Sequence, residues 1–172
     1  MFAAALVSNS ACREEPPLPE PWNPSRNRAC GLAEDALEGV PPQVQAWLRD
    51  AERVAKDRYA KRLCFDMRDL EALGSIVSGL HNQHAKKALG HDRLQTEVAR
   101  WGAVCSQIMA SRWASHWGAA MEHNLAYGHS LWIAYEGGGS YEDDCFDAAQ
   151  QYITAPIKGW TLGEHIGLRL LD

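Results

Sequence analysis

Arg112, His116 and His123 come closest in this chain to a set of residues that could do chemistry together. On a helical wheel over residues 92–135 they are in phase with Leu94 and Val98, opposite the polar side chains of the same stretch. A buried guanidinium needs an anion, and buried imidazoles need hydrogen-bond partners. The spacing therefore predicts a buried polar cluster, which is either a satisfied part of the core or an interface, or else an anion or metal site. Exposure of these side chains on a frayed helix end is the remaining alternative.

His81 and His84 form a second histidine group, three positions apart on a predicted helix. Such a pair can bind one metal ion, but a site needs a third and a fourth ligand. In a helical hairpin that turns at Gly90, His84 and His116 lie roughly 25–30 Å apart along the axis. The two histidine groups are therefore not expected to share an ion, and we assign no metal and no cofactor.

A nucleophilic site is less favoured. Cys145 follows Asp143 and Asp144, and His165 comes later, which allows a Cys–His pair. Acidic neighbours raise the pKa of a thiol and disfavour the thiolate. The segment GGGSYEDD at 137–144 lacks the lysine of a phosphate-binding loop, and we interpret it as a flexible linker. No residue is assigned a catalytic role, and a non-enzymatic protein is favoured over an enzyme.

The cysteines are odd in number and irregularly spaced, and no C-x-x-C pattern occurs, which excludes a zinc ribbon or a thioredoxin-like motif. They are Cys12, Cys30, Cys64, Cys105 and Cys145. This usage favours a reducing compartment, such as the cytoplasm or an organelle matrix, over secretion. A bridge between Cys12 and Cys30 remains an alternative.

The charge and the hydropathy of the chain limit the classes of partner that it can bind. The formal net charge is -5, and the basic run at 56–62 alternates with acidic residues, as on a solvated helix face. Nucleic-acid binding is therefore disfavoured. No stretch has the ~20 uninterrupted apolar residues of a membrane span, so no transmembrane segment is expected.

Two regions organise the chain. Residues 1–31 are expected to form an extended, proline-rich arm close to polyproline II, with Trp22 as an anchor for docking. Residues 32–172 are expected to form a single helical domain. Periodicity, prolines and glycines place helices at about 42–63, 66–89, 92–135, 142–154 and 161–171.

The third of these segments carries the main structural prediction. Between Trp101 and Tyr135 the only charged residues are Arg112 and Glu122. A helix this poor in charge must be covered on nearly every side. A polar line nevertheless runs along it at helical phase: Arg93, Arg100, Gln107, Ser111, Ser115, Glu122 and His129. We expect an all-α, irregular bundle built around one long central helix, with no useful strand pattern.

Aromatic residues crowd the second half of that segment and spread over more than half of the helical wheel. The predicted partner-binding residues are Trp22, Trp113, Trp117, Trp132 and Tyr135. Because Trp and Tyr are favoured anchors at interfaces, they indicate contact with other protein subunits. The expected function is that of a non-enzymatic accessory or scaffold subunit, or a protein-binding protein. It would dock in a larger assembly through its arm and its aromatic helix surface.

Two other functions stay open. One is a small helical metalloprotein or hydrolase that uses Arg112, His116 and His123, with acids from 142–144 or Glu164. The other is a ligand-binding helical bundle.

Overall fold

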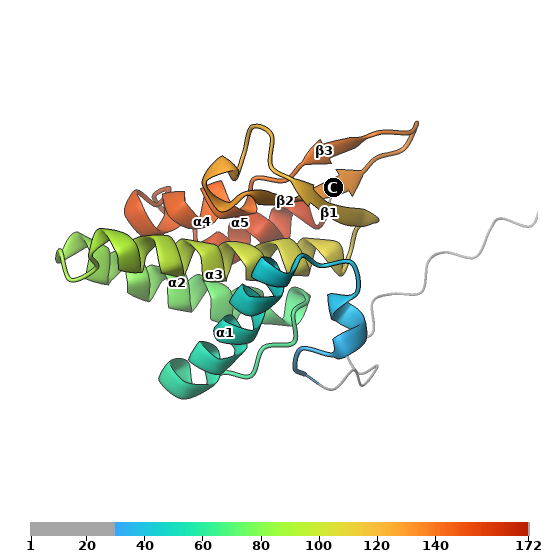
Figure 1. The fold of residues 1–172 in the computed structure, drawn as a ribbon. Coiled ribbons are helices and arrows are strands. Elements are labelled where there is room, and N and C mark those ends of the chain that lie inside the picture. The colour runs from blue at the N-terminus through green and yellow to red at the C-terminus, as the bar shows by residue number, and fades with distance from the viewer. Residues whose placement is uncertain (1–29, 172) are drawn as a thin grey trace, which may run out of the picture.

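The computed structural model describes residues 30–171, which form five α-helices, a three-stranded sheet and three short 3-10 helices (Figure 1). The helices are α1 (Pro42–Tyr59), α2 (Leu70–Ala85), α3 (His91–Ala110), α4 (Cys145–Thr154) and α5 (Leu162–Arg169). The strands are β1 (Ser115–Ala119), β2 (His129–Ala134) and β3 (Ser140–Glu142), and the 3-10 helices are η1 (Glu34–Leu37), η2 (Met67–Asp69) and η3 (Leu125–Tyr127). Trp22 and nearly all of the expected arm lie outside the described residues.

The all-α prediction is wrong, because the expected helix 92–135 stops at Ala110. The amide of Ser111 still bonds to the carbonyl of Gln107, and the chain then leaves the helix and enters β1. Residues 115–142 form an antiparallel sheet with the order β1-β2-β3. The scarcity of charge in this stretch therefore reflects two different structures, a covered helix followed by a half-buried sheet.

Glycines make the connection between β2 and β3. Gly137, Gly138 and Gly139 have φ values of 99°, 84° and 143°, a region that L side chains rarely adopt. Tyr135 donates its amide to the carbonyl of Gly139 at 3.2 Å, which closes the turn. The segment 137–144, which we interpreted as a flexible linker, thus contains the turn and the second strand of a β-hairpin.

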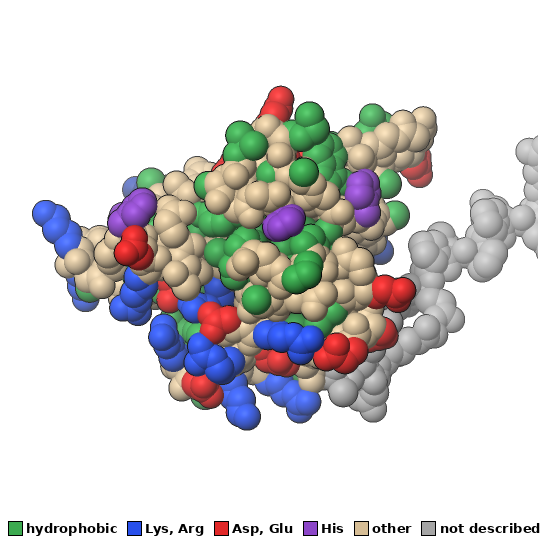
Figure 2. Space-filling model, viewed as in Figure 1, with side chains coloured by type: hydrophobic (Ala, Val, Ile, Leu, Met, Phe, Trp, Pro, Cys, Tyr) green, Lys and Arg blue, Asp and Glu red, His purple; other side chains and the backbone are tan. Residues whose placement is uncertain are grey.

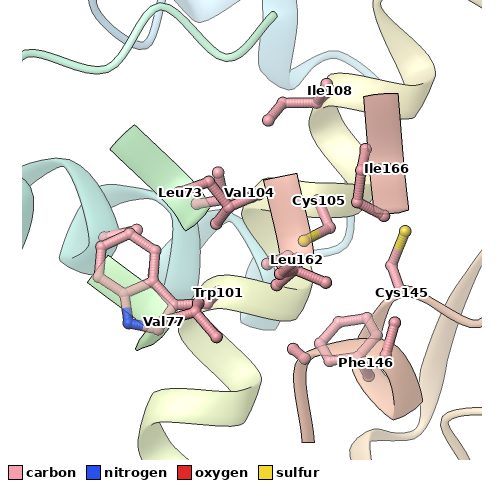
Figure 3. Packing of buried hydrophobic residues seen from close by; sticks show 14 of the residues in the cluster. Leu73, Val77, Trp101, Val104, Cys105, Ile108, Cys145, Phe146, Leu162 and Ile166 are labelled. Carbon is pink, nitrogen blue, oxygen red and sulfur yellow. The ribbon is translucent and has the colours of Figure 1, made fainter. Parts of the chain in front are cut away.

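The second half of α3 is covered as the charge pattern predicts. Every residue from Trp101 to Ser106 is buried, and α1, α2 and α4 all pack against α3 (Figure 3). Gly102 allows α4 to approach α3 closely, because a Cβ there would lie 2.9 Å from the Cα of Phe146. The core of the domain is centred on this crossing of α3 and α4.

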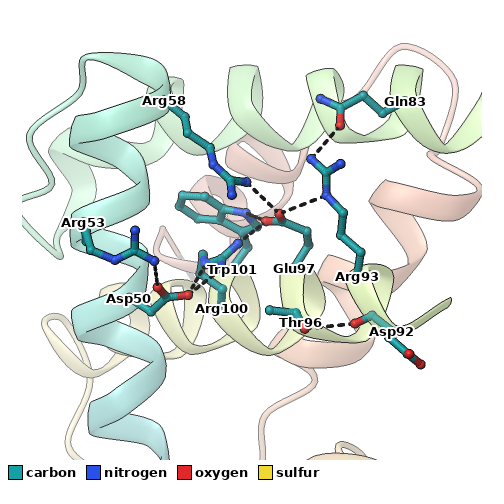
Figure 4. A network of polar contacts seen from close by, with 10 residues as sticks. All are labelled: Asp50, Arg53, Arg58, Gln83, Asp92, Arg93, Thr96, Glu97, Arg100 and Trp101. Carbon is teal, nitrogen blue, oxygen red and sulfur yellow. Dashed lines mark hydrogen bonds and ion pairs between the residues drawn. The ribbon is translucent and has the colours of Figure 1, made fainter. Parts of the chain in front are cut away.

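A buried ion network fixes α1 against α3 (Figure 4). Arg100, part of the polar line expected on this helix, is only 5% exposed and lies between Asp50 and Glu97. Its Nε donates to Asp50 at 2.9 Å, and Trp101 donates its indole N–H to Glu97 at 3.0 Å. Burial alone would lower the pKa of Arg100, but the hydrogen bonds to the two carboxylates outweigh it and raise that pKa. The guanidinium therefore stays charged inside the fold.

Glycines also bring α2 and α5 together. A Cβ on Gly163 would lie 1.9 Å from the carbonyl oxygen of Leu70, and one on Gly74 would lie 2.9 Å from the hydroxyl of Thr161. Thr161 and Glu164 form a capping box that starts α5 at this contact. Gly74 thus admits a neighbouring helix, whereas nothing lies within 4 Å of a Cβ on Gly79 in the same helix.

A disulfide joins Cys30 to Cys64, across a sequence separation of 34 residues. Cys30 therefore does not pair with Cys12, as the alternative from the sequence proposed. Disulfides persist in oxidising compartments and are rare where thiols are kept reduced. This pairing argues against the reducing compartment that the cysteine spacing favoured.

Candidate functional site

The small sheet has an inner and an outer face. Directly paired residues share a face in an antiparallel sheet, so Trp117 lies on the same side as Leu131 and Ile133. Leu131 and Ile133 are buried, and Trp117 packs against the same core. This inner face covers the end of α3, which leaves the opposite face toward solvent.

Three residues, one from each strand, form a row across the outer face. His116 pairs with Trp132, and Trp132 pairs with Glu142. The Trp132 indole lies over Gly118, where an added Cβ would come within 3.0 Å of the ring, and its N–H donates to the carbonyl of Ala119 at 3.2 Å. The indole is therefore held flat across β1 and remains half-exposed.

Glu142 ties the connection between β1 and β2 to this face. Its carboxylate accepts the backbone amides of Met121, Glu122 and His123 at 2.7–3.2 Å, and the hydroxyl of Ser130 at 2.5 Å. Partial burial raises the pKa of Glu142, but these hydrogen bonds outweigh burial and hold the pKa below its usual value. An ionised carboxylate thus organises the loop at 120–128.

The buried carboxylate of Asp143 extends the same set of polar contacts. Asn124, with a φ of 61°, donates its side-chain amide to Ser130 at 2.6 Å and to the backbone carbonyl of Asp143 at 2.8 Å. Asp143 accepts the amide of Cys145 at 2.8 Å, while its Oδ2 has no hydrogen-bond partner. Burial raises the pKa of Asp143 to about 6, although the Cys145 amide opposes the shift. These contacts connect the loop, the sheet and the start of α4.

The anchored loop presents apolar side chains to solvent. Met121 is 69% exposed, Leu125 is 63% exposed, and Tyr135 beside the hairpin turn is 55% exposed. Met121, Leu125 and the half-exposed Trp132 define what we call the outer sheet surface. Figure 2 shows hydrophobic side chains gathered over the sheet end of the molecule, whereas Lys and Arg lie mainly around α1 and at the ends of α2 and α3. Exposed apolar groups of this size on an ordered framework are typical of contact surfaces.

The predicted cluster of Arg112, His116 and His123 does not form. Arg112 is exposed and stacks over the ring of Trp113 at 5.4 Å. His116 is exposed on β1, while His123 lies in the loop with its Nδ1 3.4 Å from a carboxylate oxygen of Asp147. The cluster was placed on one helical face, and that helix ends before Arg112.

The predicted aromatic contacts divide between the two faces. Trp113 and Trp117 are half-buried and pack against the core, Trp132 belongs to the outer sheet surface, and Tyr135 is exposed beside the hairpin turn. The sequence reasoning missed Met121, Leu125 and the anchoring role of Glu142. Three consecutive glycines directly after the apolar run LWIAY were the signal for a hairpin turn that would have indicated this arrangement.

The other histidine pair serves the helical packing. His81 places its Nδ1 3.0 Å from the carbonyl of Ile153, which joins α2 to the end of α4. The Nδ1 of His84 is buried and has no hydrogen-bond partner. Within residues 30–171, no three His, Cys, Asp or Glu side chains are grouped so as to hold a metal ion. In the same range, no helix combines the length and apolar character needed to cross a membrane.

A shallow groove lies along the contact between α2 and α5. Its volume is about 530 Å³, and Glu71 and Glu164 are among the residues that line it. The rest of its lining is largely small, with Gly74, Ser75 and Gly163 next to the aliphatic Leu70. The groove forms because the glycines at this contact have no side chains and let the two helices approach.

Comparison with known proteins adds no relative. No family model matches the chain, and no curated protein or solved structure matches it either. The geometry of the described residues is therefore the basis for the functional argument.

Proposed function

We propose that this protein is a non-enzymatic, protein-binding domain that acts as an accessory or scaffold subunit and docks through its outer sheet surface. The observation that carries the proposal is the Trp132 indole, which is held over Gly118 and hydrogen-bonded to Ala119 while one side stays open to solvent. A rigid, half-exposed Trp gives a large contact area at little cost in conformational entropy. The aromatic helix surface expected from the sequence is replaced by this sheet.

The surroundings of Trp132 support the same proposal. Met121 and Leu125 add flexible apolar surface on a loop whose backbone is fixed by Glu142. Interface cores are typically enriched in Trp, Tyr and Met and depleted in charge. Of the exposed side chains near Trp132, His116 supplies a polar group that can form directional hydrogen bonds at the rim.

The alternative of a metalloprotein or hydrolase has no comparable support. Its residues Arg112, His116 and His123 lie in three separate places, on the segment before β1, on β1 itself and in the loop. The buried Asp143 is surrounded by structural contacts to Asn124 and Cys145.

Site-resolved photo-crosslinking in the source cells tests the proposal. A photoreactive amino acid at position 121 is compared with one at position 56, because Lys56 is exposed on α1, away from the sheet. We expect one protein to be captured reproducibly from position 121 and not from position 56. Purified, that protein should bind wild type at least about tenfold more tightly than Trp132→Ala.

A matched control distinguishes the loss of a partner contact from a general effect of removing a Trp side chain. Trp160→Ala removes an exposed Trp from the segment before α5 and should leave the affinity unchanged. Equal capture from both positions, or equal binding by wild type and Trp132→Ala, would refute docking through the outer sheet surface.

A further inference from the structure

Two cysteines, Cys105 and Cys145, lie inside the core where α3 packs against the start of α4. Cys105 comes one helical turn after Gly102 and therefore lies on the same side of α3, while Cys145 directly precedes Phe146. A Cβ on Gly102 would lie 2.9 Å from the Cα of Phe146. The two backbones are thus in close contact on one side of the cysteine pair.

A second contact between the same two segments lies on the other side of the pair. The hydroxyl of Ser106, which follows Cys105, is 3.4 Å from a carboxylate oxygen of Asp143, two residues before Cys145. The same carboxylate accepts the amide of Cys145 at 2.8 Å, which fixes the backbone of this cysteine. Contacts on both sides therefore hold the backbones of the two cysteines next to one another.

The side chains of the two cysteines are also in contact. Both are free thiols that are wholly buried, and they are hydrogen-bonded to one another. Figure 3 shows them as neighbours, with Leu162 and Ile166 of α5 close by. Burial raises the pKa of the Cys145 thiol, and the Cys105 thiol and the charge of Asp143 raise it further. Two thiols in contact on fixed, adjacent backbones meet the main geometric requirement for a disulfide.

The disulfide between Cys30 and Cys64 indicates that the folding chain meets an oxidant. We propose that Cys105 and Cys145 are the site of a second disulfide, which forms while the chain folds. This bond would join the end of α3 to the start of α4 and so close covalently the base of the segment that contains the sheet. The inference does not depend on docking through the outer sheet surface, so either proposal can fail alone.

The oxidant is a disulfide, either that of oxidised glutathione or that of a disulfide oxidoreductase. The thiolate of Cys105 attacks one of its sulfurs, which forms a mixed disulfide and releases one thiol. The thiolate of Cys145 then attacks the Cys105 sulfur of the mixed disulfide, and the second thiol leaves. The two cysteines lose two electrons and two protons in total, and the oxidant gains both pairs as it becomes two thiols.

Burial determines when this exchange takes place. The folded core excludes the oxidant and disfavours the thiolate of Cys145, so exchange occurs before the core closes. The same burial protects the finished bond from reductants. Cys30 and Cys64 are only partly buried, so their disulfide should be reduced first in the folded protein.

Oxidative refolding of the full-length chain tests the proposal. Reduced, unfolded protein is refolded with reduced and oxidised glutathione, quenched with acid, and mapped by mass spectrometry without reduction. We expect a peptide that links Cys105 to Cys145. In Cys12→Ser, which removes the fifth cysteine as a competing partner, no thiol should then react with an alkylating reagent under denaturing conditions. Alkylation of both Cys105 and Cys145, or a different partner for either, overturns the inference.

Graded reduction gives a second measurement on the refolded chain. Under native conditions, a phosphine reductant should open the Cys30–Cys64 bond at least about tenfold faster than the bond between Cys105 and Cys145. In concentrated guanidinium chloride the two bonds should open at similar rates. Equal rates under native conditions would contradict a disulfide inside the closed core.

Unfolding in urea measures the effect of the second bond alone. In a Cys30→Ser/Cys64→Ser chain, oxidation should raise the urea midpoint, because a cross-link restricts the unfolded chain. Adding Cys145→Ala should abolish this rise and leave the midpoint near that of the reduced chain. A rise that persists in Cys145→Ala overturns the inference. If the Cys30→Ser/Cys64→Ser chain does not fold, the peptide map of wild type decides the matter.

Discussion

Asp143 accepts the backbone amide of Cys145 at 2.8 Å, at the point where β3 ends and α4 begins. The carboxylate thus joins the small sheet to the helical core, although its second oxygen has no hydrogen-bond partner. An ionised group in this environment is costly because water is excluded from one of its oxygens.

This burial predicts a pH-dependent contribution to stability. The pKa of Asp143 is raised to about 6 from 3.8, so the folded state binds the proton more tightly than the unfolded state. Its stabilising contribution is fully present below about pH 4 and is lost as the pH rises to about 6, up to roughly 3 kcal/mol. Asp143→Asn should therefore be more stable than wild type at pH 7, by about 2 kcal/mol, in urea unfolding.

Comparing the two proteins at different pH values separates the contribution of Asp143 from that of other titratable groups. The difference in unfolding free energy between Asp143→Asn and wild type should shrink toward zero at pH 4. Asp35→Asn, at an exposed carboxylate on η1, should show no such trend. A difference that is constant across this pH range would contradict the raised pKa of Asp143.

Glu142 leads to a prediction about local order. Glu142→Gln removes the charge that accepts the amides of Met121, Glu122 and His123, so hydrogen exchange at these amides should accelerate about tenfold or more. Because the pKa of Glu142 lies below its usual value, its contribution is present above pH 4.5 and is lost as the pH falls through that lowered pKa. Hydrogen exchange followed by mass spectrometry measures the exchange rates of these amides.

Glu136→Gln, in the exposed hairpin turn, is the matched control and should leave exchange in the loop unchanged. Slow exchange at positions 121–123 in Glu142→Gln would mean that the loop does not depend on this carboxylate.

Two helical glycines should respond oppositely to alanine. Gly163→Ala places a Cβ 1.9 Å from the carbonyl oxygen of Leu70, which forces α5 away from α2 and should cost about 2–4 kcal/mol. Gly79→Ala meets open space in the middle of α2 and should stabilise the protein by about 0.5–1 kcal/mol. Chemical denaturation of the two variants measures the change in unfolding free energy that each substitution causes. Equal changes would contradict the close approach of α2 and α5.

The disulfide between Cys30 and Cys64 predicts a loss of stability on its removal. In the chain-entropy account, a cross-link over a separation of 34 residues contributes about 3–4 kcal/mol, so Cys30→Ser/Cys64→Ser should be destabilised by about this amount. Cys12→Ser should have no comparable effect. Peptide mapping without reduction checks the pairing directly, and a peptide linking Cys12 to Cys30 would refute it.

The helical elements were accessible from the sequence because apolar periodicity and helix-ending residues agree there. Pro42 begins α1 as expected, and helices occur near each of the other expected positions. The burial of Trp101 and its neighbours also follows from the lack of charge. These features depend on local patterns that a single sequence contains.

The sheet was missed for a physical reason. Ser111, Ser115, Glu122 and His129 repeat at a spacing that fits a helix, and they concealed the alternation of Leu131, Trp132 and Ile133 in β2. A short strand buries only two or three side chains, so its pattern is weak beside that of a long helix. The candidate site was misplaced for the same reason, since its residues were assigned to faces of a helix that ends at Ala110.

The crossing of α3 and α4 closes through Gly102 and Phe146, while the chain between these helices departs to form the sheet and returns beside its starting point. The part of this intervening segment that faces away from the helices contributes little to the packing between helices. Substitutions at positions such as Met121 or Leu125 can therefore accumulate without unfolding the domain. Under the proposed docking function, the residues that would contact a partner and the residues that fold the domain are largely separate sets, so the surface can change while the fold is kept.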